Sequence, residues 1–199
     1  PAKTSTSYGG QLSVLKRPLT WISITVSFLF NAAVFGVYSY LMDYLNIVTQ
    51  ASSSSVTAVL FLYGASNIVG NIIAGRLLTS IPKKAIFFLP IGLIVTYILM
   101  FSLGKYFALM IVISIIWGTL AGISANVTQY VITSSAPDAP DLSNGIFLSS
   151  VNLGTTVGTF LGGIFIASLG SNFVILAGIV ISILNIVFVI IRNKKINSL

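Results

Sequence analysis

The chain has 199 residues, of which 56% are hydrophobic and only 7% are charged, and its formal net charge is +7. A soluble domain has roughly a quarter of its residues charged, so this composition predicts an integral membrane protein whose surface faces lipid. The chain has no cysteine and no histidine. A thiol nucleophile, a disulfide framework and Cys/His metal sites are therefore excluded.

The excess of basic residues does not indicate nucleic-acid binding. The lysines and arginines lie at the ends of apolar runs, which is typical of topology signals rather than of a phosphate-binding face. The three acids, Asp43, Asp138 and Asp141, fall at opposite ends of the predicted spans, so they do not form a catalytic pair. We therefore expect no enzyme, no cofactor and no nucleic-acid partner.

Residues 1–17 contain Ser, Thr and Gly, lack an apolar core and end in Lys16 and Arg17, so they are not a signal peptide. Because the chain begins with Pro1 rather than Met, we expect this segment to be a cytoplasmic linker that follows another part of a longer protein. A six-span helical bundle is predicted over 18–192, followed by a cytoplasmic tail over 193–199.

Six apolar runs are each long enough for a helix of about 20 residues to cross the membrane. They are expected at 19–42, 56–78, 85–103, 106–133, from just after Asp141 to 169, and 173–191.

Helix breakers separate these runs, and the predicted fold class is an all-α membrane protein. Pro82, Gly104 and the segment 136–141 each interrupt the apolar pattern. Asp141 is expected to be the N-cap of the fifth helix, because its side chain can accept a backbone hydrogen bond and its charge suits the positive helix end.

The distribution of basic residues predicts the orientation. Nine lysines and arginines fall on the side of both termini, and Lys105 alone falls on the other. The positive-inside rule then places both termini in the cytoplasm of a multi-pass protein in the cell (inner) membrane. The fourth-to-fifth connection on this side is acidic, and a contact with a basic segment elsewhere is one explanation.

An internal similarity predicts two inverted three-helix repeats. The segments 70–75 and 158–163 both read glycine, polar, two large apolar residues, small, glycine. They lie in the second and fifth spans, which cross the membrane in opposite directions, as in many transporters. Chance agreement between six glycine-rich residues is the alternative.

Neutral polar side chains recur along four of the six spans. A single interhelical hydrogen bond explains each one alone, but together they predict a shared polar cavity. Amides and tyrosine rings suit sugars or bulky amphipathic molecules better than a bare ion, and no ionisable group lies near the middle of a span, where a proton relay needs one. The candidate cavity contacts are Asn31, Tyr38, Asn126, Gln129 and Tyr130.

The chain resembles the C-terminal half of a major facilitator superfamily transporter, especially the bacterial drug and sugar efflux permeases. The segment from Gly75 to Lys84, which includes Arg76 and Lys83, is similar to a degenerate copy of the family's loop signature, roughly Gly-x-x-x-Asp-Arg-x-Gly-Arg-Arg. The segment 136–141, followed by 152–154 and 158–163, is similar to part of the sugar efflux permeases.

The resemblance implies that the first and fourth spans line a central cavity and that the second and fifth face the other half. It implies a proton-coupled efflux antiporter for drug-like amphipaths or sugars, whose partners are an N-terminal six-span half, the substrate and the lipid bilayer. A stand-alone six-span channel or carrier acting as a homodimer is the alternative. The expected residues between the halves are Asn67, Asn152, Thr156, Gly154, Gly158 and Gly162. For the three glycines, spaced four apart, close packing between two helices is the alternative explanation.

Overall fold

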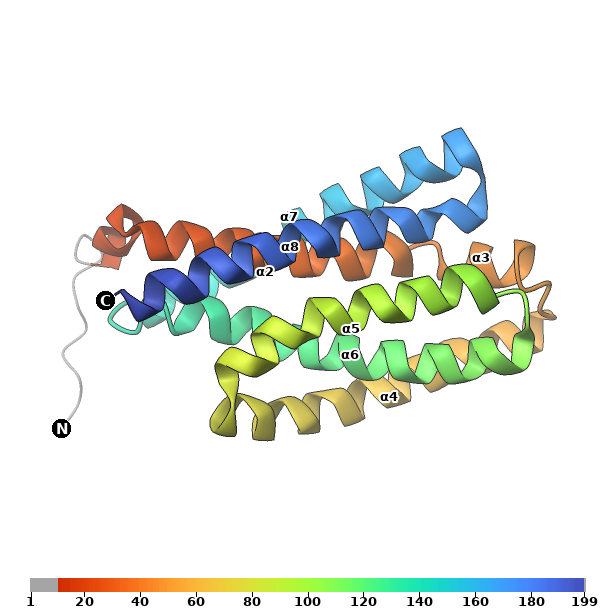
Figure 1. The fold of residues 1–199 in the computed structure, drawn as a ribbon, viewed down its shortest axis with the longest axis horizontal. Coiled ribbons are helices and arrows are strands. Elements are labelled where there is room, and N and C mark those ends of the chain that lie inside the picture. Colours follow the sequence, from red (N-terminus) through yellow and green to blue (C-terminus); the bar gives the residue numbers. More distant parts are fainter. Residues whose placement is uncertain (1–10, 199) are drawn as a thin grey trace.

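The computed structural model describes residues 11–198, so the first ten residues of the predicted linker and the last residue of the tail lie outside the described range. Within that range, long helices run side by side in an elongated bundle (Figure 1). In chain order, the elements are η1 (Leu12–Lys16), α2 (Pro18–Tyr38), α3 (Leu41–Ile47), α4 (Ser53–Ser80), α5 (Pro82–Leu103), α6 (Phe107–Thr133), α7 (Pro140–Leu169), η2 (Ser171–Phe173) and α8 (Val174–Asn197).

Within residues 11–198, six helical segments are long and apolar enough to cross a membrane, which confirms the six predicted spans. The segment η1 and the C-terminal end of α8 lie at the same end of the bundle (Figure 1), as an even number of crossings requires. Helix α4 ends at Ser80, Ile81 follows, and Pro82 occupies the first turn of α5, where a missing N–H costs nothing.

The first span is broken, whereas the sequence predicts one continuous helix. It consists of α2 and α3, with Ser39 and Tyr40 between them. The Ser39 and Thr159 hydroxyl oxygens are 2.8 Å apart, and the Tyr40 hydroxyl donates to the Thr159 carbonyl oxygen at 3.0 Å. These contacts to α7 hold the break in place.

Two predicted boundaries differ from the structure. Helix α8 continues through most of the predicted tail to Asn197, because Lys194 and Lys195 in its last turn suit the negative end of the helix. Asp141 is not the N-cap of α7. The helix begins at Pro140 with Ala139 as N-cap, and the Asp141 charge lies in the first turn.

The described part of the predicted linker is packed against the bundle. Val14 in η1 is fully buried and packs with Ala136 and Ala139. The Leu142 backbone N–H donates to Oε1 of Gln11 at 3.2 Å. Residues 11–17 are therefore part of the fold rather than a free linker.

Arg17 joins this segment to the acidic α6–α7 connection. Its guanidinium donates two hydrogen bonds to the Asp138 carboxylate, from Nη1 at 2.9 Å and from Nη2 at 2.6 Å. These hydrogen bonds hold the pKa of Asp138 below its ordinary value and raise that of Arg17. A contact with a basic segment, which was one explanation of the acidic connection, is therefore present in the fold.

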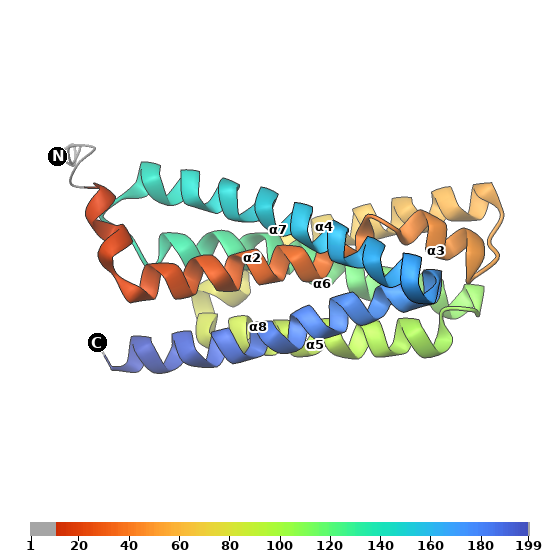
Figure 2. The ribbon, with the colours of Figure 1, turned by 90° about the horizontal axis from the view of Figure 1, so that it is seen from above.

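Helices α2 and α6 form the centre of the bundle. In their most apolar stretches, 67% and 50% of residues are buried, against 28% in α4 and 22% in α7. Helix α2 lies between α7 and α8 (Figure 2) and also packs on α6. Helices α4 and α7 therefore present wide exposed faces.

The helix pairs follow a regular scheme. Helix α4 packs on α6, α7 packs on α2, and α5 packs on α8. The scheme is symmetric between the two halves of the chain. If the first, second and third spans exchange places with the fourth, fifth and sixth, the same three pairs result. Such a scheme is what inverted three-helix repeats would produce, and the repeat itself stays a prediction.

Candidate functional site

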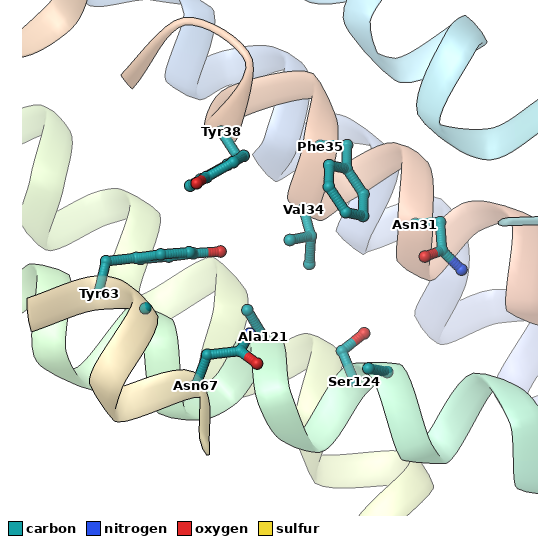
Figure 3. A pocket seen from close by; sticks show the side chains of 10 residues that line it. Asn31, Val34, Phe35, Tyr38, Tyr63, Asn67, Ala121 and Ser124 are labelled. Carbon is teal, nitrogen blue, oxygen red and sulfur yellow. The ribbon is translucent and has the colours of Figure 1, made fainter. Parts of the chain in front are cut away.

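A hollow of about 370 Å³ lies between α2, α4 and α6 (Figure 3). Helix α2 supplies Asn31, Val34, Phe35 and Tyr38 to its wall. Helix α4 supplies Tyr63, Gly64 and Asn67, and α6 supplies Ala121, Ser124 and Ala125. No lining residue carries a charge, so the hollow is a mixed apolar and neutral polar surface.

An aromatic cluster forms one end of this hollow. The rings of Tyr38 and Tyr63 stack, and Trp117 packs edge-on against both. Trp117 is fully buried and also contacts the ring of Tyr97. The Tyr97 hydroxyl donates to the Ala33 carbonyl oxygen at 2.7 Å. The cluster therefore fixes the positions of α2, α4, α5 and α6 around the hollow.

Several polar atoms in the wall have no hydrogen-bond partner among the described residues. Nδ2 of Asn31 donates to the Ser27 carbonyl oxygen at 2.9 Å, which leaves its Oδ1 as a free acceptor. Oδ1 of Asn67 accepts from Asn71, which leaves its Nδ2 as a free donor. Asn31 and Ser124 lie at the opposite end of the hollow from the tyrosines (Figure 3). The hollow thus offers a donor and an acceptor in its wall and an aromatic face at one end.

A row of three amides connects this wall to the next turn of α6. Asn126 Nδ2 donates to Oδ1 of Asn71 at 2.5 Å, and Asn71 Nδ2 donates to Oδ1 of Asn67 at 3.0 Å. The same Asn126 nitrogen also donates to the Gly122 carbonyl oxygen at 3.1 Å. Asn126 therefore orients Asn67 through Asn71 and does not itself line the hollow.

The predicted cavity residues do not all come together. Asn31 and Tyr38 line the hollow, and their role as substrate contacts stays a prediction. Gln129 is exposed one helical turn beyond Ala125. Tyr130 lines a different hollow, next to Arg192. The polar residues that were expected to share one face of α6 therefore do not all face the same hollow.

The predicted interface between halves needs correction at its glycines. Gly154, Gly158 and Gly162 are buried, and a Cβ at any of them would collide with a backbone oxygen of α2. They pack two helices of the same chain, which is the alternative explanation of the glycine spacing.

The other expected interface residues occupy two environments. Asn67 lines the hollow. Asn152 and Thr156 are exposed on α7, so their position beside another six helices stays a prediction.

The residues of the degenerate loop signature lie around the short α4–α5 connection. Arg76 is exposed in the last turns of α4, and Lys84 is exposed at the start of α5. Nζ of Lys83 donates to Oδ1 of Asn197 at 2.6 Å. In this chain, the connection thus contacts the end of α8.

Some important residues were not expected from the sequence. Ser124 lines the hollow, and Ser114, Ala121 and Thr128 are buried on the same helix. Small residues at this helical spacing are the signal that could have identified the inner face of α6. Arg192 is only 2% exposed, although its sequence surroundings are those of a basic tail.

Comparison with known proteins agrees with this architecture. The family model of the Major Facilitator Superfamily matches residues 7–198. A protein described as a probable sugar efflux transporter of Pasteurella multocida is 27% identical over 98% of this chain and 48% of its own length. Another of the same description, from Helicobacter pylori strain 26695, is 27% identical over 98% of this chain and 51% of its own length.

The inner membrane transport protein YdhP of Escherichia coli K12 is 28% identical over 93% of this chain and 48% of its own length. The chain therefore spans about half the length of the curated relatives that it matches. Because the family match covers nearly the whole chain, the chain belongs to the major facilitator superfamily.

Proposed function

We propose that the chain forms the C-terminal six-span half of an efflux carrier, and that the hollow between α2, α4 and α6 is its part of the substrate cavity. The observation that carries this proposal is the convergence of a stacked tyrosine pair with free amide and hydroxyl groups in one uncharged hollow. Ligand sites commonly combine an apolar, aromatic wall with a few polar groups that fix orientation.

The proposed substrate is a neutral sugar, with a drug-like amphipath as the other candidate. A sugar presents hydroxyl groups to amides and a C–H face to an aromatic ring, and the hollow has Asn31, Asn67 and Tyr38 for these contacts. Two of the relatives are described as probable sugar efflux transporters. A charged substrate would need a counter-charge, which the described wall does not provide.

We infer that efflux is coupled to proton entry. Of the three acids, Asp43 is exposed in α3, and Asp138 and Asp141 lie at the α6–α7 connection. Proton relays use ionisable groups at membrane depth, so we assign the coupling acid to another part of the transporter. Loss of efflux when an uncoupler removes the proton gradient would support proton coupling, and full efflux under that condition would contradict it.

We also propose that both ends of the chain are cytoplasmic. Lys16, Arg17, Lys83 and Lys194 lie at one end of the bundle, and Lys105 follows α5 at the other. Because the chain has no cysteine, a Ser198→Cys variant and a Ser52→Cys variant each carry one thiol. An impermeant thiol reagent added to intact cells should label only the second variant, and labelling of only the first would reverse the orientation.

Transport measurements in the intact carrier test the cavity assignment. The double substitution Asn31→Ala with Asn67→Ala should lower efflux of the transported sugar strongly. Asn46→Ala is the matched control, because this amide is exposed on α3, outside the hollow. Unchanged efflux in the double variant, with normal protein levels, would remove the hollow from the transport path.

Efflux measurements also distinguish the two proposed arrangements of the chain, a half of a larger carrier and a six-span carrier that acts as a homodimer. We expect the chain alone to be inactive, because its relatives are about twice as long. Co-expression with an N-terminal six-span half should restore efflux. Transport by the chain alone would favour the homodimer.

A further inference from the structure

A second hollow, of about 320 Å³, lies where α2, α5, α6 and α8 meet at the end of the bundle that holds η1. Its polar lining consists of Lys83, Tyr130, Ser134 and Arg192. Apolar side chains, including Leu19, complete the wall. Two cations and two hydroxyl groups therefore share one small space.

Arg192 is the central group of this hollow. Its Nε donates to Oγ of Ser23 at 3.1 Å. Its Nη2 donates to the Val131 carbonyl oxygen at 3.2 Å and to Oγ of Ser134 at 3.0 Å. Nη1 makes no hydrogen bond to residues 11–198, so part of the guanidinium fork is unused.

The buried guanidinium has no acidic partner among the described residues. Asp43 is in α3 at the opposite end of the bundle. Asp138 is paired with Arg17, and Asp141 accepts a hydrogen bond from Gln11 at 3.4 Å. A buried cation is costly unless an anion compensates its charge.

Lys83 adds a second positive charge at the rim of the hollow. It is exposed, and its Nζ donates to Asn197 at 2.6 Å. An ammonium group has three N–H donors, so this hydrogen bond leaves capacity for an anion. The buried fork and the exposed ammonium group thus flank the same space.

We propose that this hollow binds a phosphate group, held by the Arg192 guanidinium and the Lys83 ammonium, with the Tyr130 hydroxyl as a neutral donor. The two N–H groups of Nη1 can donate to phosphate oxygens, and such charge-assisted hydrogen bonds are among the stronger ones in proteins. The phosphate comes from an anionic phospholipid headgroup or from a free phosphate compound. Basic pockets between transmembrane helices at the membrane surface bind such headgroups. The proposal does not depend on the substrate of the carrier.

Thermal unfolding of the purified, delipidated carrier in neutral detergent tests the site. Four additions are compared: phosphatidylglycerol, phosphatidylcholine with the same acyl chains, inorganic phosphate, and chloride at equal ionic strength. Stabilisation by phosphatidylglycerol but not by phosphatidylcholine identifies a lipid headgroup. Stabilisation by inorganic phosphate but not by chloride identifies a free anion. No selective stabilisation by either phosphate compound overturns the proposal.

Substitutions then locate the effect. Arg192→Gln should abolish the stabilisation, and Lys83→Gln should weaken the apparent affinity about fivefold, as expected for one basic side chain near the membrane surface. Lys195→Gln is the matched control, because this residue is exposed on the same helix end and does not line the hollow.

If Arg192→Gln does not fold, because it removes three hydrogen bonds, Lys83→Gln decides the question. This lysine is exposed and is hydrogen-bonded to Asn197, so the variant should fold. Equal losses of affinity in Lys83→Gln and Lys195→Gln would indicate nonspecific attraction and would overturn the proposal.

Discussion

Tyr38 of α2 and Tyr63 of α4 stack with their ring centroids 4.7 Å apart and their planes inclined by 24°. Trp117 of α6 lies edge-on to both, with centroid distances of 6.2 Å and 4.9 Å. The three helices that enclose the proposed substrate cavity therefore meet in one aromatic contact. Tyr38 is partly exposed and Tyr63 is buried, so Tyr38 is the ring available to a substrate.

The stack predicts different results for two substitutions of Tyr38. Tyr38→Ala removes the ring, and a stacking contact of about 1 kcal/mol corresponds to about a fivefold higher KM for efflux. Tyr38→Phe keeps the ring and should stay within about twofold of the wild type if the hydroxyl contributes little. The measurement is the dependence of the efflux rate on substrate concentration. Equal KM values for the alanine variant and the wild type would exclude stacking as a source of affinity.

The amide row predicts a graded loss of transport. Asn67→Ala removes a group in the wall, and Asn126→Ala removes the hydrogen bond that orients it through Asn71. A hydrogen bond contributes about 1 kcal/mol, so Asn126→Ala should raise KM about fivefold, and Asn67→Ala should raise it at least as much. The KM of the double variant should be no higher than the KM of Asn67→Ala alone. Additive losses would show that Asn126 acts independently of Asn67.

The glycine contact between α2 and α7 predicts a loss of stability. A Cβ at Gly158 would collide with the Ala32 carbonyl oxygen, and backbone atoms cannot move aside without separating the helices. Gly158→Ala should therefore destabilise the fold by about 1–3 kcal/mol, as overpacking does. Gly145→Ala is the control on the same helix, because nothing lies within 4 Å of its Cβ position. Thermal unfolding in detergent compares the two, and equal stability would contradict the close contact.

The pairing of Arg17 with Asp138 predicts a dependence of stability on pH. The pKa of Asp138 is lowered in the folded protein from an ordinary value of 3.8. A carboxyl group of this kind stabilises the fold above its ordinary pKa, and the stabilisation is lost as the pH falls through the lower folded-state pKa. Asp138→Asn should therefore lower the unfolding temperature at neutral pH, and the difference from the wild type should shrink in strong acid. A difference that stays constant down to the lowest pH would contradict the pairing.

The six spans could be predicted because the bilayer imposes length and apolarity on each helix. The helix ends at Pro82 and near Gly104 follow from local backbone chemistry, which the sequence shows directly. The break at Ser39 and Tyr40 could not be predicted in the same way, because it depends on contacts with Thr159 in a distant helix. Local patterns therefore define the helices but not the contacts that interrupt them.

Contacts between helices also limit the prediction of the site. The spacing of Gly154, Gly158 and Gly162 predicts a close helix contact, but it does not say which helix fills it. Arg192 is followed by a basic tail in the sequence, yet Ser23 and Ser134 from two other helices surround it. The polar residues of α6 share a stripe, yet Asn126 and Tyr130 face different neighbours. Such assignments depend on tertiary packing, which a single sequence does not show.

The pairing of α2 with α7, and of α4 with α6, interlocks the chain. Each pair joins one helix from the first three spans to one from the last three, and glycines bring their backbones into contact. Neither group of three spans therefore has a complete core by itself. A ribosome that has synthesised only α2 to α5 has made helices whose tightest partners do not yet exist, so the bundle assembles only after α6 and α7 have entered the membrane.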